Sequence, residues 1–330
     1  MLKKNIKNKK DIFVILSPLH FYISKTLIKY LNIEEVVIVC IEELKELVKG
    51  KFENIIIMEY PQKKDKGIKR LLILKKNLFF NIKEEFETIY IPMDYDIYIQ
   101  AFLKNNKFNR INLFEEGGTL YYLLTENRSR NIFIKKIKKI LKFILGLECT
   151  ENILTSNRIK EAYMFFPKEL KNFNPKIHYI DLNLIIERNG ERIEVEDKYK
   201  NIDYLILTQP LTEDGLTINK IEVEVIKNFI QPEKKYLIKL HPRDSEEKYK
   251  EILSLDNVKL LDNKYQNIPY QVLHYSLNPK NIVSHFSSVL YTTPSIREDF
   301  KRIALVKNLK NEKILETVKI MSKYINIEIR

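Results

Sequence analysis

The chain has 330 residues, of which 45% are hydrophobic and 31% charged, and its formal net charge is +13. This composition is that of a soluble globular protein and excludes a disordered one, and the length is sufficient for two domains of ordinary size. The basic balance favours anionic partners such as nucleotides, acidic sugars or anionic lipid headgroups. We expect no nucleic-acid partner, because no DNA- or RNA-binding signature accompanies the charge.

Cysteine usage and the N-terminal sequence bear on the compartment. Cys40 and Cys149 form no disulfide framework, which fits a reducing environment. The apolar run at 12–16 ends before Pro18 and is too short for a secretory signal. No later run has the length of a membrane span. We therefore expect a cytoplasmic protein.

The first half of the chain alternates short β-rich runs with helical patterns. Strands are predicted at 11–16, 35–40, 54–59, 88–92 and 110–114. Helices are predicted at 22–31, 42–49, 67–79 and 95–105. Strands spaced by helices of this length indicate βαβ units and a parallel sheet.

A basic amphipathic helix is predicted at 131–147, with isoleucines and leucines on one side and lysines on the other. The simplest interpretation is a surface helix packed on its own domain. A dimer contact and an anionic membrane surface are the alternatives. The charged run at 187–200 is typical of a linker between domains.

The alternation of strands and helices restarts after this linker. Strands are predicted at 204–208, 236–240, 258–261, 281–284 and 303–306. Helical segments are predicted at 217–229, 245–253, 268–275 and 312–324. The sequence therefore predicts an α/β protein with two βαβ domains joined by a linker, for which the cleft between domains is the natural ligand site.

Three polar clusters each follow a predicted strand of the second half. They are 208–215, 241–243 and 285–288. The carboxyl ends of parallel strands lie at one edge of a sheet, which is where ligands bind in open α/β folds. We therefore expect the three clusters to contribute to one site.

The residue types in these clusters suit group transfer from a nucleotide-linked donor. Ser287 and Ser288 can hold a phosphate at a helix start. His241 can stabilise or protonate a leaving phosphate, and Asp214 or Glu213 can act as general base on an acceptor hydroxyl. Simpler interpretations stay open: a strand exit for the histidine, an N-cap for the serines, and a helix cap for the acids.

A fourth cluster, Glu115-Glu116-Gly117, follows the last predicted strand of the first half. Adjacent acids followed by glycine permit a tight turn and close approach of the backbone to a ligand. The glycines here lack the Lys-Ser/Thr of a phosphate-binding P-loop, and no GxGxxG pattern occurs.

Metal-binding patterns are not found in the sequence. His20, His178 and His274 show no ligand spacing with one another, and the two cysteines lie elsewhere. We therefore predict no essential structural zinc.

Taken in chain order, these motifs resemble those of bacterial sialyltransferases. An acidic pair with glycine, then His-Pro, then a serine motif, each after a strand, is the ordered pattern of that group. Within it the chain looks most similar to family 52 of the glycosyltransferases, which includes the lipooligosaccharide sialyltransferases. The resemblance covers most of the chain, through the segments 13–31, 89–103, 113–119, 205–214, 240–243, 268–277 and 286–290.

The resemblance implies a GT-B architecture, in which two Rossmann-like parallel-sheet domains face each other across a cleft. Residues 1–185 would form the acceptor-side domain, with a helical insertion near 125–170. Residues 186–200 would be the linker, and 201–330 would bind the CMP-sugar. The closing helix at 312–324 would pack back on the first domain.

The implied activity is an inverting, metal-independent transfer of sialic acid from CMP-sialic acid. The acceptor would be a hydroxyl of a terminal galactose or sialic acid in a surface glycan such as lipooligosaccharide or capsule. No cofactor is implied beyond the donor. The resemblance assigns His241 to the departing CMP phosphate and assigns Ser287 and Ser288 to contacts with it. The remaining residues of the expected CMP site are Gln209, Pro242 and Pro269.

The resemblance leaves two places open for the general base. Family 52 has its catalytic Asp shortly after a Pro, here Pro210, but in this chain the acids arrive only at Glu213 and Asp214. Related sialyltransferase families use the acidic motif of the first domain instead. We expect Asp214 to be the base, with Glu116 as the alternative. The expected acceptor-side residues are Glu115, Glu116 and Gly117.

The resemblance also implies partners. Lipooligosaccharide members of the family form dimers by exchanging helices after the acidic motif, so we expect a homodimer through the helix at 131–147. We expect peripheral contact with an anionic membrane at the inner face of the cytoplasmic membrane. Two other functions stay open: a GT-B enzyme with another nucleotide sugar, and a non-catalytic basic protein that binds membranes or polyanions.

Overall fold

A computed structural model of the chain describes residues 10–62, 65–116, 139–140, 142–147, 158–165, 175–180, 193–292, 301–322 and 325–330. The described residues up to Ile180 form one compact unit, and those from 193 onward form a second. Each unit is built around its own parallel sheet.

The sheet of the first unit has the strand order β3-β2-β1-β4-β5-β6-β7. Its strands are β1 (Asp11–Ile15), β2 (Val36–Cys40), β3 (Ile55–Ile57), β4 (Glu85–Ile91), β5 (Lys107–Phe114), β6 (Ile159–Met164) and β7 (Lys176–Tyr179). All neighbouring pairs are parallel. Its helices are α1 (Pro18–Tyr30), the short η1 (Glu42–Leu44) and α2 (Lys45–Val48), α3 (Ile68–Phe79) and α4 (Ile97–Asn105).

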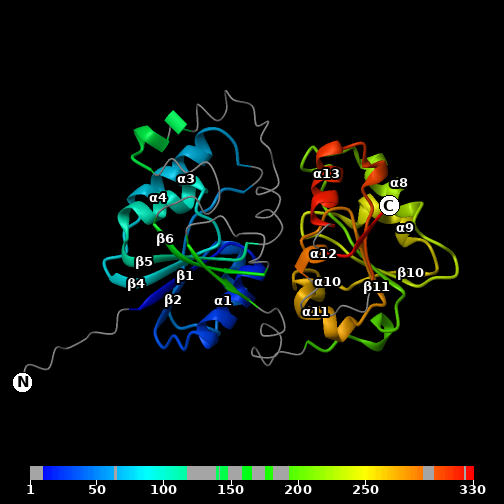
Figure 1. The fold of residues 1–330 in the computed structure, drawn as a ribbon, viewed down its shortest axis with the longest axis horizontal. Coiled ribbons are helices and arrows are strands. Elements are labelled where there is room, and N and C mark those ends of the chain that lie inside the picture. Colours follow the sequence, from blue (N-terminus) through cyan, green and yellow to red (C-terminus); the bar gives the residue numbers. More distant parts are fainter. Residues whose placement is uncertain are drawn as a thin grey trace, which may run out of the picture. The chain divides into compact units, whose positions relative to one another are not determined.

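The direction in which strands are added to this sheet reverses between β1 and β4. Right-handed crossovers then place α1 and α2 on one face of the sheet and α3 and α4 on the other. Figure 1 shows α1 on the opposite side of the sheet from α3 and α4. The strands are apolar because they are covered on both faces. Phe13 of β1, for example, is fully buried and stacks on Tyr90 of β4 with ring centroids 4.2 Å apart.

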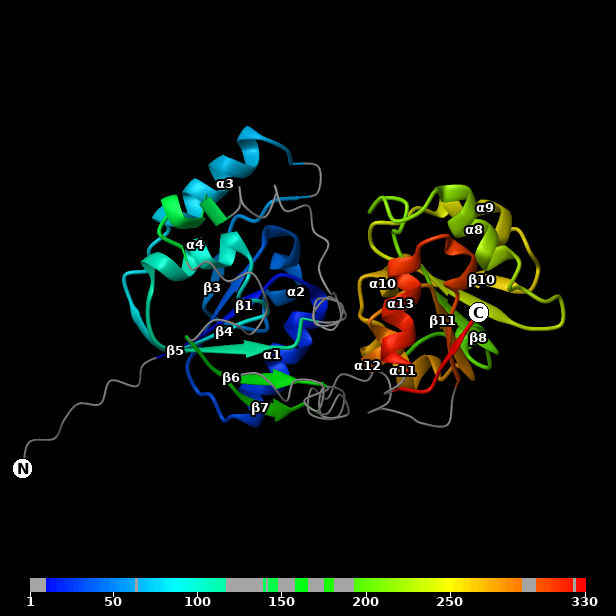
Figure 2. The same ribbon diagram turned by 45° about the horizontal axis from the view of Figure 1, so that its top comes forward.

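The second unit repeats this design with the strand order β10-β9-β8-β11-β12-β13. Its strands are β8 (Tyr204–Leu207), β9 (Tyr236–Lys239), β10 (Val258–Leu260), β11 (Asn281–Ser284), β12 (Lys301–Ala304) and β13 (Ile327–Ile329). Its helices are η3 (Asp197–Tyr199), α8 (Asn219–Lys227), η4 (Glu246–Tyr249), α9 (Lys250–Leu253), α10 (Asn263–Gln266), α11 (Tyr270–Leu277), α12 (Val289–Thr292), η6 (Lys307–Leu309) and α13 (Glu312–Met321). Figures 1 and 2 show α8 and α9 on one side of this sheet and α10 to α13 on the other.

The prediction of an α/β protein with two Rossmann-like parallel-sheet domains is confirmed. The strands β6, β7 and β13 were not predicted. β6 lies inside the region expected as a helical insertion, 125–170, where Lys160 and Glu161 interrupt the apolar run that would mark a strand. Pairing with β5 nevertheless buries Ala162 and Tyr163.

Several expected segments lie largely outside the described residues. Of the helix at 131–147 the structure describes 139–140 and 142–147, and of the linker at 186–200 it describes 193–200. The domain boundaries and the docking of the closing helix on the first domain stay predictions. None of the helices in the described parts of the chain combines the length and apolar character needed to cross a bilayer.

Candidate active site

The three polar clusters of the second unit follow β8, β9 and β11, which are consecutive in the sheet order β9-β8-β11. The direction of strand addition reverses between β8 and β11. Such a reversal opens a crevice at the carboxyl ends of the strands, and ligands of open α/β sheets bind there. The topology therefore brings the clusters after β8 and β11 to the two sides of this crevice, with the cluster after β9 beside them.

Thr208 joins the loops after β8 and β9. Its hydroxyl oxygen accepts the backbone N–H of His241 at 2.8 Å, and its O–H donates to Oδ2 of Asp244 at 2.5 Å. Thr208 is buried, and the side chain of Asp244 is fully buried. Each of these polar groups therefore has a hydrogen-bond partner, and the two bonds hold the loop that carries His241 in place.

His241 is a neutral hydrogen-bond donor in this arrangement. Burial, together with the positive charges of Arg243 and Lys239, lowers the pKa of His241 to about 4. The backbone N–H of Arg243 donates to Nδ1 at 3.1 Å, so Nδ1 carries no proton. The proton of the neutral ring is therefore on Nε2, which can donate to a phosphate oxygen. Burial therefore disfavours a charged ring near neutral pH.

Asp214, the expected base, is held by Arg243. The guanidinium donates from Nη1 and Nη2 to the two carboxylate oxygens at 2.8 and 2.9 Å. Both side chains are partly exposed. This bidentate pair gives each carboxylate oxygen one partner, so a general base here would have to act from an oxygen already bound to Arg243. It also ties the loop after β8 to the loop after β9.

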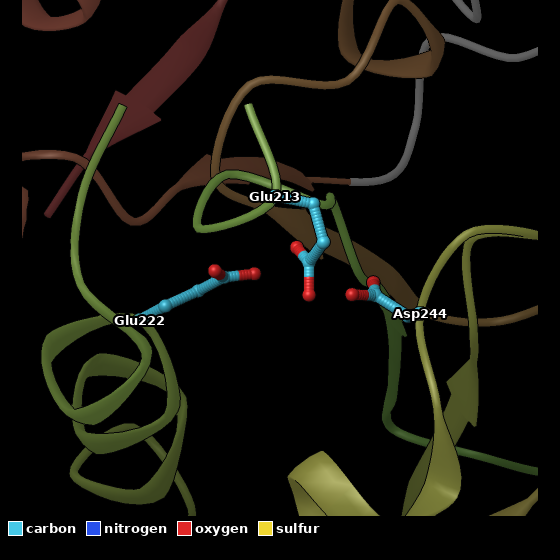
Figure 3. A group of neighbouring side chains, drawn as sticks. All are labelled: Glu213, Glu222 and Asp244. Carbon is cyan, nitrogen blue, oxygen red and sulfur yellow. The ribbon is translucent and has the colours of Figure 1, made fainter. Parts of the chain in front are cut away.

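Glu213, the second expected acid, belongs to a cluster around Lys248. The ammonium lies 3.0 Å from Glu213, 2.9 Å from Glu222 of α8 and 2.8 Å from Asp244. Figure 3 shows the three carboxylates turned toward one another. We call Lys248, Glu213, Glu222 and Asp244 the Lys248 cluster. Burial favours the neutral form of Glu222, but hydrogen bonds from Lys248 and Thr212 outweigh it and lower the pKa of Glu222.

The Lys248 cluster has the donor set of a cation site, since oxygens of the three carboxylates lie within 4.8 Å of one another. Carboxylate oxygens are the ligands that hard divalent cations prefer. Here, however, the ammonium of Lys248 lies within hydrogen-bond distance of each carboxylate. A lysine therefore supplies the positive charge at the centre, and the cluster is an internal ion network that supports the loops.

The serine motif begins the short helix α12. Oγ of Ser287 accepts the backbone N–H of Val289 at 3.3 Å, so the N-cap interpretation describes its contact. Its hydroxyl hydrogen remains available to a phosphate, because an accepting oxygen can still donate. Ser288 is partly exposed. Of the other residues expected to bind CMP, Pro269 caps α11, Pro242 is exposed, and Gln209 donates to the carbonyl of Thr208 at 2.8 Å.

The acidic motif of the first unit follows β5, and its two acids differ. Glu115 is fully buried, and its Oε2 accepts the backbone N–H of Phe165 at the end of β6 at 3.0 Å. Glu115 therefore links the carboxyl end of β5 to that of β6. Glu116 is partly exposed. His20 supports the motif through a hydrogen bond with the backbone of Glu116. Gly117 lies outside the described residues.

Sequence reasoning missed Lys239, the last residue of β9. The side chain is buried, and its ammonium donates to the carbonyl oxygen of Gln266 at 2.5 Å. Burial lowers the pKa of Lys239 to about 8. The signal was a lysine within the apolar run Tyr236 to Leu240. A buried ammonium at the carboxyl end of a strand, two residues before His241, is suited to an anionic ligand.

The fold resembles that of solved bacterial sialyltransferases. The alpha/beta-galactoside alpha-2,3-sialyltransferase of Photobacterium phosphoreum matches with a TM-score of 0.55 at 15% identity, over 98% of this chain and 99% of that one. The 2,6-sialyltransferase of Photobacterium sp. JT-ISH-224, solved with CMP and lactose, matches with a TM-score of 0.54 at 12% identity, over 97% and 78% of the two chains. At these identities the likeness shows the fold alone.

The fold is therefore of the GT-B type, with two parallel-sheet α/β domains. The sequence model of the alpha-2,8-polysialyltransferase family matches residues 2–306, and the chain belongs to this family. An uncharacterised protein of Haemophilus influenzae is 26% identical over 254 residues, which are 72% of this chain and 76% of the relative. The prediction of a bacterial sialyltransferase is confirmed.

Proposed function

We propose that the protein transfers sialic acid from CMP-sialic acid to a hydroxyl of a terminal galactose or sialic acid on a surface glycan such as lipooligosaccharide or capsule. The observation that carries this proposal is the hydrogen bond from the backbone N–H of Arg243 to Nδ1 of His241 at the carboxyl edge of the sheet of the second unit, which leaves Nε2 to carry the proton of a neutral ring. A donor of this kind can stabilise the negative charge that develops on a leaving phosphate.

The reaction proceeds by direct displacement. A carboxylate removes the proton of the acceptor hydroxyl while the acceptor oxygen attacks the anomeric carbon of sialic acid. The bond from that carbon to the phosphate oxygen breaks, and CMP leaves with the electron pair, so the configuration inverts. His241 donates from Nε2 to the departing phosphate, and Ser287 and Ser288 bind its other oxygens. Gln209, Pro242 and Pro269 line the CMP site, and the reaction needs no metal.

For the base we now favour Glu116 and keep Asp214 as the alternative. Asp214 is bound through both oxygens by Arg243, and Glu213 by Lys248. Glu115 is buried against a backbone N–H, which leaves Glu116 as the partly exposed acid of its motif. Because Arg243 is committed to Asp214, it is poorly placed to serve a second phosphate. This favours a donor with one phosphate over a nucleoside-diphosphate sugar.

The test is a direct assay of CMP release and of sialylated product, with CMP-sialic acid and either lactose or a sialyllactose acceptor. We expect turnover with at least one acceptor, unchanged by EDTA. His241→Ala should lower kcat by about 10²-fold or more, whereas His178→Ala, a change in the first unit, serves as the control. Turnover of UDP-sugars with no CMP release would overturn the donor assignment.

A pair of isosteric variants decides the base. Glu116→Gln should lower kcat by about 10²-fold or more with CMP binding retained, and Asp214→Asn should have a smaller effect. Glu233→Gln, an exposed acid of the second unit, is the matched control. The reverse order of effects would establish Asp214 as the base.

Homodimerisation through 131–147, a cytoplasmic location and contact with an anionic membrane also belong to the proposal.

A further inference from the structure

His20 of α1 connects the ends of two strands of the first unit. Its ring is buried, and burial lowers the pKa of His20 to about 4, so the ring is neutral near neutral pH. Nδ1 accepts the backbone N–H of Leu16, directly after β1, at 3.1 Å. The proton of the neutral ring is therefore on Nε2. The ring also makes a hydrogen bond with the backbone of Glu116. Because Nε2 is a donor, the carbonyl oxygen of Glu116 accepts this bond.

The local structure fixes the ring of His20 in this position. Ser17 caps α1, and its hydroxyl oxygen accepts the backbone N–H of His20 at 3.3 Å. The ring lies edge-on against that of Phe114, the last residue of β5, with centroids 5.5 Å apart and planes at 86°. Phe114 is fully buried. The cap, the two hydrogen bonds of the ring and the aromatic packing together leave the histidine little freedom to move.

His20 lies where ligands are expected at the first sheet. The direction in which strands are added reverses between β1 and β4, and such a reversal opens a crevice at the carboxyl ends of the strands. β4 lies between β1 and β5 in the sheet order. Since the ring bonds to the residue after β1 and to Glu116, two residues after β5, it spans the carboxyl edge of the sheet at this crevice.

The acidic motif is held from two sides. The carboxylate of Glu115 accepts the backbone N–H of Phe165, at the end of β6, while His20 holds the carbonyl oxygen of Glu116 from the side of β1. β6 and β1 lie on opposite sides of β5 in the sheet order. The backbone that carries the carboxylate of Glu116 is therefore fixed by both contacts, although the side chain itself is partly exposed.

We propose that His20 is a positioning residue for the general base Glu116: by binding the backbone of Glu116, the ring sets the place from which the carboxylate reaches the acceptor hydroxyl. A displacement of about 1 Å at a reacting group can cost about 100-fold in rate. His20 touches no reacting atom in this role and acts only through Glu116. The inference rests on the proposed function, with Glu116 as the base. A histidine that only packs in the core is the alternative that the experiment must separate from it.

Two substitutions of His20 each keep one of the two hydrogen bonds of the ring. His20→Gln places an amide N–H near the position of Nε2, so it keeps the bond to Glu116 and loses the bond from Leu16. His20→Asn places an amide oxygen near the position of Nδ1, so it keeps the bond from Leu16 but is too short to reach Glu116. We expect kcat to fall by about 10-fold or more in His20→Asn and to stay within about 3-fold of the wild type in His20→Gln. KM for CMP-sialic acid should change in neither variant, because the proposed donor site lies in the second unit.

A double-mutant cycle with Glu116→Gln tests whether His20 acts through the base. If it does, His20→Asn lowers kcat in the wild type but adds no further loss to the Glu116→Gln variant. The matched control is His178→Asn, which removes a histidine of β7 that stacks on Tyr163 with ring centroids 4.8 Å apart. This control should leave kcat unchanged. Rates are compared at a temperature at which circular dichroism shows every variant to be folded.

The outcomes separate this role of His20 from the reaction itself. A wild type that releases no CMP with any acceptor would overturn the proposed function and this inference with it. If the wild type is active, an unaffected Glu116→Gln variant would overturn the choice of base and therefore the role of His20. If Glu116→Gln is slow, three results would overturn the positioning role alone: wild-type kcat in His20→Asn, equal losses in His20→Asn and His20→Gln, or additive losses in the cycle.

Discussion

The hydroxyl of Thr208 accepts the backbone N–H of His241 at 2.8 Å, and this contact links the loop after β8 to the ring at the centre of the proposed site. The same hydroxyl donates to Asp244. Thr208→Val removes both bonds and leaves a buried N–H and a buried carboxylate with one partner fewer. Such losses cost about 1–3 kcal/mol each. We expect kcat/KM for the donor to fall by about 10-fold or more, and the melting temperature to fall as well.

Thr208→Ser removes the methyl group and keeps the hydroxyl, so it separates the contributions of the two groups to activity. Serine keeps the donor and acceptor, so its kcat/KM should stay close to that of the wild type. Steady-state kinetics with CMP-sialic acid measure both variants. If the serine variant loses as much as the valine variant, packing of the methyl group matters and the hydrogen bonds do not.

A second prediction concerns the charge on His241. Burial is the main reason for the low pKa of His241, about 4, and the guanidinium of Arg243 is the next. Arg243→Gln removes that positive charge but keeps the backbone N–H that binds Nδ1. We expect the pKa of His241 to rise toward its ordinary value of about 6.5. NMR titration of the ring measures it.

The control for that titration is His285, whose pKa is also lowered to about 4 by burial but not by Arg243. Its titration should be the same in the wild type and the Arg243→Gln variant. An unchanged pKa for His241 would mean that the guanidinium charge is screened at this position.

The sequence predicted the positions of the strands better than it predicted which strands pair with one another. Apolar runs located β1, β8, β9 and β11 to within about one residue, because buried parallel strands are continuously apolar. The polar clusters were placed at strand ends for the same reason. The order β9-β8-β11 depends on pairings between distant segments, such as Leu205 with Leu237 and with Ile282, which no local pattern encodes.

Local sequence patterns likewise did not predict the contacts of the site residues. Asp214 and Glu213 were predicted as candidates for the general base or as a helix cap, but Arg243 and Lys248 reach them from the segment after β9. Helical periodicity gives no hint that Glu222 of α8 is fully buried, because a charged residue is expected to face solvent. Only the folded structure shows that the carboxylate of Glu222 has Lys248 as its partner.

A third prediction concerns stability at acid pH. Burial lowers the pKa of His20 and of His285 from 6.5 to about 4. Between these values the unfolded chain binds protons that the folded chain does not. The free energy of unfolding should therefore fall as pH falls from about 6.5 to 4, by up to ~1.4 kcal/mol per pH unit for each histidine. Urea unfolding at a series of pH values measures the slope.

His285→Gln tests this assignment, since glutamine does not titrate. The variant should have a shallower slope between pH 6.5 and 4. Above that window the difference in stability between variant and wild type should be independent of pH, which serves as an internal control. A slope equal to that of the wild type would assign the acid sensitivity to other groups, such as Glu222, whose lowered pKa acts in the same direction.

The last prediction tests whether the ammonium of Lys248 occupies the place that a metal cation would otherwise take. Its ammonium lies about 3 Å from Glu213, Glu222 and Asp244, and its side chain is only 5% exposed. Lys248→Met leaves three carboxylates facing one another, which should cost about 3–5 kcal/mol of folding stability. The vacated centre then has the donors that Ca²⁺ or Mn²⁺ prefers. We expect these ions to raise the melting temperature of the variant and EDTA to lower it again.

The comparison with Lys227→Met makes this test specific. Lys227 pairs with Glu251 at 3.0 Å, but both side chains are more than half exposed, so the loss should be within about 1 kcal/mol. Neither this variant nor the wild type should respond to the same ions, because in both the ammonium of Lys248 stays at the centre of its carboxylates. A wild-type response equal to that of Lys248→Met would show that the ion binds elsewhere. A destabilised Lys248→Met variant that no divalent cation rescues would show that the three carboxylates move apart once the ammonium is removed.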